Sequence, residues 1–314
     1  MAKVYCIIVT FNGDKWIEKC LSSLVNSDVS TNTQLTVICI DNGSTDLTLS
    51  IIRERFPSIH LNTTGKNLGF GQANNIGFIA AIQNKADYVF LLNQDAWVEK
   101  NTIANLVNIQ QKNPGFGIIS PVHLNGDGTG LDLYFKNYLL KSALPANTVP
   151  ENIAKANSNL LINTEFVNAA AWLISIDCLK KTGGFDPLFF HYGEDQNFAQ
   201  RAIHSSYQVG IFAGCKIYHD REDRILASAK GTYPDIKKEW VQFLVYACDI
   251  NRSKFGSFIG RRFLKYSLLS VKNIFLFNKE AFSFNYRMAK RIISSFLKIK
   301  KSRERAFVNG IYLT

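Results

Sequence analysis

A chain of 314 residues with 46% hydrophobic residues is long enough for one large α/β domain with additional elements, or for two domains. Its formal net charge of +11 is unevenly placed, because residues 1–223 carry 17 Lys and Arg against 20 Asp and Glu, whereas residues 224–314 carry 19 against 5. No stretch reaches the roughly 20 apolar residues of a membrane-spanning helix, and residues 1–13 lack the pattern of a secretory signal peptide. We therefore expect no membrane span, and an anionic partner for the basic C-terminal part.

Continuous apolar runs alternate with helical patterns along the first 113 residues. The runs predict buried strands at 4–9, 35–40, 59–62 and 87–92. Helices are expected from Trp16, after Thr45 as a cap, around Ile76, and from 102 to 113. This alternation is typical of an α/β fold with a mostly parallel sheet that helices cover on both faces.

The second half of the chain is less regular. Residues 120–165 are expected to be irregular, followed by strands at 166–176 and 209–220, the latter ending at His219. From about residue 224 the pattern becomes helical, basic and aromatic. We therefore divide the chain into an α/β domain, residues 1–223, and a basic helical C-terminal region, residues 224–314.

The six cysteines are spread along the chain and form no C-x-x-C pair. The spacing of a metal site is absent, and a disulfide framework is unusual in a chain of this length. We interpret the cysteines as reduced thiols and expect a cytoplasmic protein.

Polar segments follow three of the predicted strands, namely TFNG, DNGSTD and NQD. In parallel α/β sheets, ligands bind outside the carboxyl ends of the strands. Asp95 in NQD follows an apolar run, where a bare carboxylate is costly unless it is hydrated, paired or bound to a cation. Two interpretations of Asp95 stay open, an acid in a surface loop and a ligand of a metal ion.

Seven motifs, IVTFNG, DNGSTD, KNLGFGQANNIG, LLNQD, GGFD, GED and YHD, occur in this order within residues 1–223. Together they resemble the family 2 glycosyltransferases, in particular the rhamnosyltransferase-like branch that builds bacterial surface polysaccharides. The resemblance implies the GT-A fold. It also implies a donor that is a nucleotide-diphosphate sugar, and a divalent cofactor, Mg²⁺ or Mn²⁺, that neutralises the diphosphate.

The resemblance assigns a donor site to the first half of the chain. Asp41 would accept a hydrogen bond from the imide N–H of uracil or thymine, although a role in capping the next helix is the alternative. Lys66 would meet phosphate, and the chain near Gly69 would approach it closely. The nucleotide-sugar-binding residues are thus expected to be Thr10, Asn12, Asp41, Lys66, Gly69 and Asn93.

For the metal, the resemblance implies Asp95 and His219 as ligands. The family's usual motif at this place is D-x-D, but here Asn93 takes the first position, which leaves one strong carboxylate ligand. The alternative for His219 is a hydrogen-bonded histidine at a strand end.

For catalysis, the resemblance implies Asp195 as the general base that takes a proton from an acceptor hydroxyl in one inverting displacement. The alternative for Asp195 and Glu194 is a pair of acids at a helix N-terminus, and Arg201 is expected to pair with one of them. On the acceptor side we expect Trp172, His191 and Tyr192, although aromatic residues fill cores more often than they stack on sugars.

The C-terminal region combines Lys and Arg with Phe, Leu and Ile at helical spacing. Such helices lie on anionic membrane surfaces or pack as a cap with a solvated basic face, and both interpretations stay open. The pair Asn251-Arg252 resembles a segment that follows the catalytic domain in this branch.

The leading hypothesis is an inverting glycosyltransferase that moves a sugar from a UDP- or dTDP-sugar to a hydroxyl of a glycan or lipid-linked acceptor, peripheral to the inner face of the membrane. The alternatives are a nucleotidyltransferase, disfavoured because TFNGDKW is not a Gly/Arg-rich phosphate loop, and a non-catalytic sugar-nucleotide-binding module. Nucleic-acid binding is suggested only by the basic region, and we expect no nucleic-acid partner.

Overall fold

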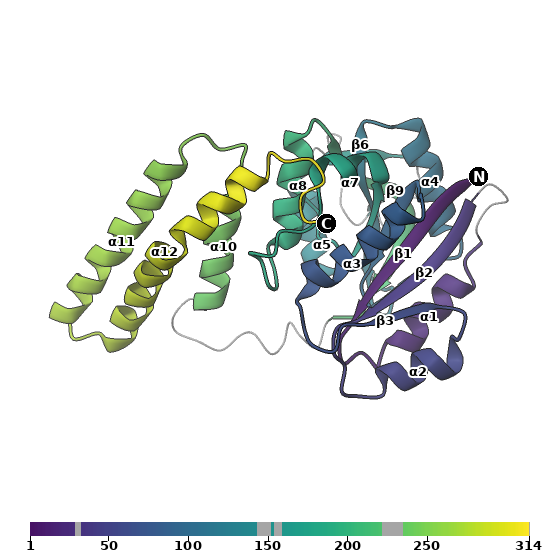
Figure 1. Cartoon of the computed structure of the whole chain (residues 1–314), viewed down its shortest axis with the longest axis horizontal. Helices are drawn as coiled ribbons and strands as arrows, with labels where there is room; N and C mark the ends of the chain where they lie inside the picture. Colours follow the sequence, from purple (N-terminus) through teal and green to yellow (C-terminus); the bar gives the residue numbers. More distant parts are fainter. Residues whose placement is uncertain (29–32, 143–151, 154–158, 222–234, 314) are drawn as a thin grey trace.

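The computed structural model describes residues 1–28, 33–142, 152–153, 159–221 and 235–313 (Figure 1). The strands are β1 (Ala2–Thr10), β2 (Thr33–Asp41), β3 (His60–Thr63), β4 (Tyr88–Leu92), β5 (Ala96–Val98), β6 (Phe116–Asn125), β7 (Leu161–Thr164), β8 (Ala171–Ser175) and β9 (Gln208–His219). The helices are α1 (Ile17–Val25), α2 (Thr48–Arg55), α3 (Phe70–Gln83), α4 (Thr102–Lys112), α5 (Leu133–Leu140), α7 (Ile176–Thr182), α8 (Glu194–His204), α10 (Ile236–Cys248), α11 (Phe255–Phe275) and α12 (Lys279–Arg305).

One sheet organises the α/β part, with the strand order β3-β2-β1-β4-β8-β6-β9-β5, and β7 pairs with β9. The half built from β3, β2, β1 and β4 is parallel, as the alternating pattern predicts. In the other half, β8 is antiparallel to both neighbours, and β9 is parallel to β6 but antiparallel to β5 and β7. The expectation of a mostly parallel sheet is therefore right for the first half and wrong for the second.

Helices cover both faces of the sheet, which explains why its strands are apolar on both sides. On one face, buried side chains of α1, α2 and α4 pack on the sheet. On the other face, α3, α5, α7 and α8 contribute Phe78, Phe135, Leu179 and Phe198 to a second buried cluster. The sheet is therefore buried between two layers of helices, and its polar strand ends lie outside these layers.

The structure corrects several local expectations. Within the described part of residues 120–165, β6 continues to Asn125, and α5 and β7 follow; the rest of that range lies outside the described residues. The strand expected at 166–176 is shorter. Helix α2 begins at Thr48 with Leu47 at the N-cap position, so Thr45 does not cap it; the carboxylate of Asp46 accepts the Thr48 N–H at 3.0 Å in the turn before the helix. The short strand β5 was not expected.

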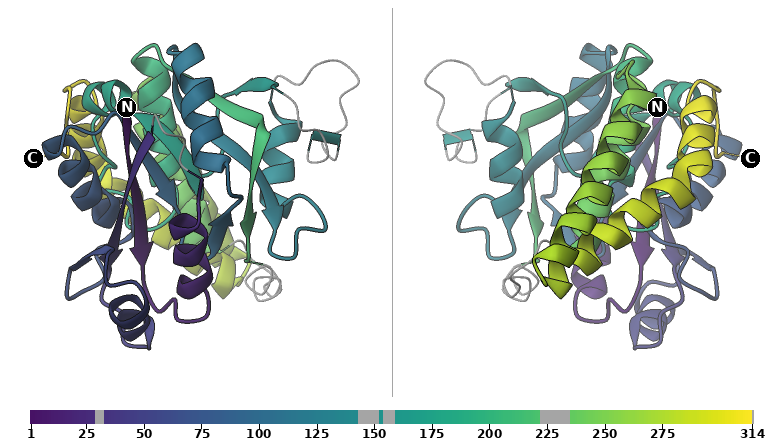
Figure 2. Two further views of the ribbon diagram at one scale, coloured as in Figure 1. Left: turned by 90° about the vertical axis from the view of Figure 1, so that its right-hand side faces the viewer. Right: turned by 90° about the vertical axis from the view of Figure 1, so that its left-hand side faces the viewer.

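Helices α10, α11 and α12 form the helical C-terminal region, and none of the described helices is long and apolar enough to cross a membrane. The α11–α12 hairpin lies at the far side from the sheet, beyond α10 (Figures 1 and 2). The inner sides of these helices share a buried cluster with Phe189 of the α/β part. The predicted boundary between 223 and 224 lies outside the described residues.

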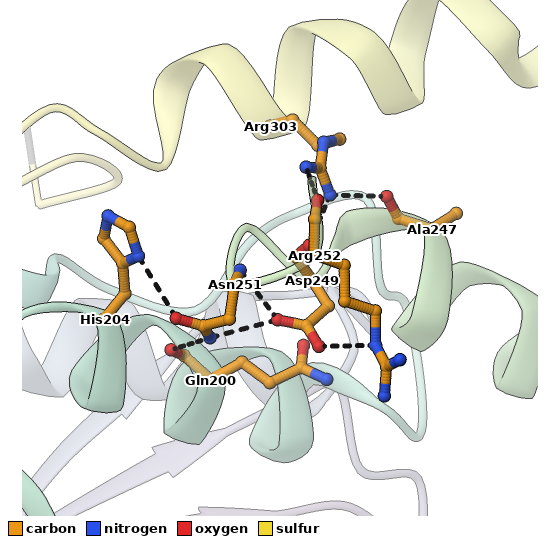
Figure 3. Close-up of polar contacts among 7 residues, drawn as sticks. All are labelled: Gln200, His204, Ala247, Asp249, Asn251, Arg252 and Arg303. Atoms are coloured by element: carbon orange, nitrogen blue, oxygen red, sulfur yellow. Dashed lines mark hydrogen bonds and ion pairs between the residues drawn. The ribbon is translucent and has the colours of Figure 1, made fainter. Parts of the chain in front are cut away.

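Polar contacts fix the C-terminal region to α8 and its surroundings (Figure 3). The Asn251 amide donates to the carbonyl of Gln200 at 2.9 Å, and its oxygen lies 3.1 Å from Nδ1 of His204. Within the C-terminal region, the Arg303 guanidinium of α12 donates to the carbonyls of Ala247 at 3.0 Å and Arg252 at 2.8 Å, which ties α12 to the end of α10. The inner face of the C-terminal region is thus a packed cap, which was one of the two interpretations of its sequence.

Candidate active site

The carboxyl ends of β1 and β2 are joined through Asp41. The Thr10 hydroxyl donates to Oδ1 of Asp41 at 3.1 Å, and the backbone N–H groups of Gly43 and Ser44 donate to Oδ2 at 3.1 Å each. Both side chains are buried. A carboxylate offers roughly four lone-pair sites, so these three hydrogen bonds leave about one acceptor site for a further donor.

Asn42 connects this turn to the loop before α3. Its side-chain oxygen accepts the Leu68 N–H at 2.8 Å, and its amide donates to Oδ1 of Asn67 at 3.0 Å. Sequence reasoning missed Asn42, although it lies inside the DNGSTD motif next to Asp41. These hydrogen bonds join the turn after β2 to the loop before α3, and the Asn67 side chain also accepts the Gly69 N–H at 2.8 Å.

Gly69 has φ +84°, and a Cβ built there would lie 2.1 Å from the carbonyl oxygen of Phe190. The glycine therefore admits the aromatic loop around Phe190, a reason that differs from the expected approach to phosphate. Lys66 is exposed on the same loop. This contact places the loop with His191 and Tyr192 against the start of α3, and Tyr192 is exposed.

The loop after β1 is tied to two other strand ends. The side-chain oxygen of Asn12 accepts the Thr45 N–H at 2.9 Å, which holds Asn12 beside the turn after β2. The Gln94 amide exchanges hydrogen bonds with the backbone of Phe11 at 2.9 and 3.1 Å. A Cβ at Gly13 would lie 2.3 Å from the Gln94 side chain, so this packing requires glycine. The neighbouring Asn93 is half-buried, and its N–H donates to the carbonyl of Ala170 at 2.9 Å.

Asp95 and His219 lie side by side. Strand β5 begins directly after Asp95 and pairs with the end of β9, so that Ala96 faces His219 and the Asp220 N–H donates to the Asp95 carbonyl at 2.9 Å. Nε2 of His219 is 3.4 Å from Oδ1 of Asp95, and both side chains are buried. The structure thus brings together the two residues predicted as metal ligands.

Asp132 and Arg221 continue this cluster, and sequence reasoning missed both. Oδ2 of Asp132 is 3.9 Å from Nδ1 of His219 and accepts from Nε of Arg221 at 2.7 Å. Asp132 also caps α5 by accepting the Phe135 N–H at 2.8 Å. No sequence signal pointed to Asp132, because its segment was expected to be irregular, whereas Arg221 follows YHD directly.

The two acids at the start of α8 have different surroundings. Oδ1 of Asp195 accepts the Gln196 N–H at 2.8 Å, and Oδ2 accepts the Ala169 N–H at 3.4 Å. Burial raises the pKa of Asp195, and the charge of Arg221 acts against this rise. Burial and the neighbouring Asp195 raise the pKa of Glu194 to about 8. Within the described part of the chain, Oε2 of Glu194 has no hydrogen-bond partner.

Two expectations about this region are not met. The Arg201 guanidinium donates to Oδ1 of Asn197 at 3.0 Å and to the carbonyls of Thr182 and Gly184 at 2.6 Å each, so it supports the chain before α8 and forms no pair with Glu194 or Asp195. Trp172 is fully buried and packs on Phe198 at 6.0 Å between ring centroids. It has no exposed face for a sugar, and we leave it out of the acceptor site.

The donor set suits a divalent cation that also binds phosphate. No group of three or more His, Cys, Asp and Glu side chains that could hold a metal ion occurs among the described residues. Asp95 and His219 supply two donors, and adjacent ligands about 2.1 Å from one ion lie about 3 Å apart, close to the observed separation. Mg²⁺ at nucleotides is typically bound by one or two carboxylates, with the rest from phosphate and water; here one carboxylate and one imidazole take the place of the protein ligands. The residues present therefore fit the implied cofactor.

Known proteins are similar to this chain in sequence and in fold. The chain is 24% identical over 255 residues to N-acetylglucosaminyl-diphospho-decaprenol L-rhamnosyltransferase of Mycobacterium tuberculosis, covering 72% of this chain and 81% of that protein. It is 22% identical over 223 residues to dTDP-rhamnosyl transferase RfbF of Shigella flexneri, covering 71% of each.

Among solved structures, Staphylococcus aureus TarS 1–349 in complex with UDP-GlcNAc is similar with a TM-score of 0.54 and 16% identity, covering 97% of this chain and 78% of that one. GalNAc-T7 with UDP, GalNAc and Mn²⁺ is similar with a TM-score of 0.56 and 13% identity, covering 96% and 58%. These likenesses confirm the GT-A fold expected from the resemblance. The family model described as Glycosyl transferase family 2 matches residues 5–171, more than half of the chain, and the chain therefore belongs to this family of glycosyltransferases.

Proposed function

We propose that this glycosyltransferase binds a UDP- or dTDP-sugar at the carboxyl ends of β1, β2 and β4. The pair Asp95 and His219, 3.4 Å apart at the ligand edge of the sheet, is the observation that carries the proposal. The nearby turn around Asp41 supplies an acceptor for a pyrimidine imide, and Thr10, Asn12, Gly69 and Asn93 line the approach. The family membership favours sugar transfer over the nucleotidyltransferase alternative.

Asp95 and His219 would hold Mg²⁺ or Mn²⁺. The ion would supply positive charge to the diphosphate, which makes the nucleotide a better leaving group. Asn93, which replaces the first carboxylate of D-x-D, contributes a neutral amide at this place. The exposed ammonium of Lys66 would add a point charge to the phosphates.

Asp195 is the proposed general base. It would accept the proton of an acceptor hydroxyl while that oxygen forms a bond to the anomeric carbon and the bond from this carbon to the phosphate oxygen breaks. The nucleotide diphosphate would leave with the bonding electrons, in one displacement that inverts the anomeric configuration. The backbone N–H groups of Gln196 and Ala169 hold the Asp195 carboxylate in place, and its raised pKa brings it closer to the pH at which a base is effective.

The acceptor is proposed to be a glycan or a lipid-linked glycan of a cell-surface polysaccharide. The printed names of two relatives, a transferase acting on a diphospho-decaprenol and a dTDP-rhamnosyl transferase, support this class. His191 and Tyr192, on the loop against Gly69, would contact the acceptor. A cytoplasmic enzyme that is peripheral to the membrane would meet such a lipid.

The test is a panel of nucleotide sugars offered with Mg²⁺, Mn²⁺ or EDTA, with release of the nucleotide diphosphate as the readout. We expect one UDP- or dTDP-sugar to be hydrolysed slowly in the presence of metal. Binding of a nucleotide sugar without any release, with all acceptors offered, would favour the non-catalytic binding module.

A further inference from the structure

The outward side of α11 carries a row of exposed apolar residues. Leu264, Leu268, Val271 and Phe275 are all exposed and are separated by four, three and four residues, which places them along one face of the helix. The buried residues of α11, including Ile259 and Tyr266, lie on a different face, which packs on α10 and α12. The apolar row therefore does not take part in the packing of α11 on α10 and α12.

The turn from α11 to α12 continues this row. Leu276 and Phe277 follow Phe275 directly, and the Phe277 side chain is 91% exposed. Phe277 has φ +51°, a conformation that favours glycine or asparagine in an ordinary surface turn. An aromatic residue in this position is unexpected if it only meets water.

Cations flank the apolar row. Arg261, Lys265 and Lys272 are exposed and follow the same four- and seven-residue spacing, so they form a strip beside the row. Residues 255–305 contain 13 Lys and Arg but only two acids, Glu280 and Glu304. Long basic side chains next to buried apolar groups keep their charge in the headgroup layer while their stems cover apolar surface.

The hairpin has a definite orientation to the active site. In Figures 1 and 2 the carboxyl ends of β1 and β2 and the α11–α12 turn lie toward the same, lower side of the molecule. A planar surface in contact with the α11–α12 turn would therefore lie on the same side of the molecule as the carboxyl ends of β1 and β2, where the donor site is proposed.

We propose that the α11 face and the following turn, namely Arg261, Leu264, Lys265, Leu268, Val271, Lys272, Phe275, Leu276 and Phe277, bind the surface of an anionic phospholipid bilayer. We name these residues the α11 membrane face. Apolar residues enter the interface and the cations pair with lipid phosphates, as in other interfacial helices. The inference deepens the proposed function, because it states where the enzyme meets a membrane-anchored acceptor.

A second copy of the chain is a poorer occupant of this face. Two copies packed through it would bring two strongly basic hairpins together, and like charges in an interface are unfavourable. An anionic bilayer supplies the opposite charge and an apolar layer at the same time.

The first experiment measures binding of the full chain to sedimented vesicles without any substrate. Vesicles of phosphatidylcholine alone are compared with vesicles of equal parts phosphatidylcholine and phosphatidylglycerol. We expect binding only to the anionic vesicles. Binding should be lost at high salt, because the Debye screening length falls from about 10 Å at 0.1 M to about 3 Å at 1 M salt. Equal binding to both vesicles, or none to either, would overturn the proposal.

Charge variants locate the surface. Lys265→Glu with Lys272→Glu should weaken vesicle binding by at least about 25-fold, since each cation near such a surface contributes about fivefold. The control is Lys112→Glu with Lys180→Glu, an equal charge change at exposed positions of the α/β part. Equal weakening by both pairs would mean nonspecific attraction, and the α11 membrane face would be rejected.

A fluorescent label tests insertion of the turn. All six native cysteines are free and buried, so a thiol-reactive polarity probe should label Phe277→Cys selectively. Its emission should shift to shorter wavelength with anionic vesicles, whereas the same probe at Val25→Cys, an exposed position at the end of α1, should not shift. A shift that depends on protein concentration and occurs without vesicles would instead indicate a second copy as the occupant.

These measurements need no sugar transfer, so their failure would remove the membrane contact but leave the proposed donor site and sugar transfer untouched. Titration of soluble nucleotide with the same variants tests that function separately, and the affinity for UDP should be unchanged in all of them.

Discussion

Nε2 of His219 lies 3.4 Å from Oδ1 of Asp95, although the two residues belong to distant parts of the sequence. Their meeting depends on β5, a strand of three residues that pairs with the end of β9. The pairing turns a loop acid and a strand-end histidine into one buried pair at the carboxyl end of β9. A cation held by this pair and a purely structural contact predict different effects of mutation, which makes the pair the first target for mutation.

Asp95→Ala should abolish the metal dependence of UDP binding, because it removes the one carboxylate of the pair. Calorimetry with Mn²⁺ and with EDTA should show much tighter binding with metal in the wild type and equal, weak binding under both conditions in the variant. Asp127→Ala, at an exposed turn, serves as the control and should keep the difference. Equal UDP affinity with and without metal in the wild type would exclude the metal role.

Asp132→Asn should lower the metal-dependent affinity for UDP by about 10- to 100-fold, as expected when the partner of a metal-binding histidine is lost. Asn caps a helix about as well as Asp, so α5 should keep its start while the charge facing His219 is removed. Asp235→Asn makes the same change at the cap of α10 and should have no effect. An unchanged metal affinity for Asp132→Asn would mean that Asp132 serves only as the cap and the partner of Arg221.

Asp195→Asn should keep donor binding and reduce kcat by roughly 10²- to 10⁴-fold, the usual contribution of a general base. The substitution nearly conserves shape, so nucleotide affinity measured by calorimetry should stay within about threefold. Asp177→Asn, at the exposed first turn of α7, is the matched control. Transfer within a few-fold of the wild type would show that Asp195 is not the base.

Glu194→Gln should change how stability depends on pH. Because burial and Asp195 raise the pKa of Glu194 to about 8, the folded protein holds a proton that the unfolded chain releases near 4.5. Stability of the wild type should therefore fall as pH rises from about 5 to about 9, and the variant should lack this part of the fall, on the order of 2–4 kcal/mol. Urea unfolding at several pH values measures it, and parallel curves for both proteins would contradict the raised pKa.

Asn251→Ala should destabilise the protein by about 1–2 kcal/mol, because it removes the hydrogen bond to Gln200 and the contact with His204 that join the C-terminal region to α8. Asn273→Ala is the control, since the Asn273 amide donates to the carbonyl of Leu269 in its own helix. Thermal unfolding of both variants gives the comparison. A larger loss for Asn273→Ala would mean that the region is not held by the contacts in Figure 3.

Other contacts between the C-terminal region and the α/β part predict that the α/β part does not tolerate removal of the residues from about 235 onward. Phe189 would lose its buried surroundings, and the Gly184 N–H would lose the carbonyl of Ile311, which it meets at 2.7 Å. We expect the truncated chain to aggregate, because a large apolar patch would be exposed. The truncated chain is expressed at low temperature and purified, and dynamic light scattering then measures its aggregation. A monodisperse truncated chain that binds UDP would show that the C-terminal cap is dispensable.

The first half of the fold could be predicted from sequence for a simple physical reason. A parallel strand buried on both faces needs an unbroken apolar run, and the runs before Thr10, Asp41 and Asn93 end abruptly in polar residues. Thr10 and Asp41 were therefore placed correctly at adjacent strand ends. The second half was harder, because antiparallel and parallel pairings alternate around β8 and β9, and short apolar runs do not reveal which partner a strand will take.

The sequence by itself determined the alternation of strands and helices, the family motifs and the concentration of charge beyond residue 224. Each is a local property, readable from neighbours along the chain. Only the tertiary structure decided which of these residues meet: that His219 lies beside Asp95, that Asp132 and Arg221 join them, that Trp172 is buried, and that Arg201 supports carbonyls instead of acids. Such contacts depend on strand register and helix packing between distant segments, which no local pattern encodes.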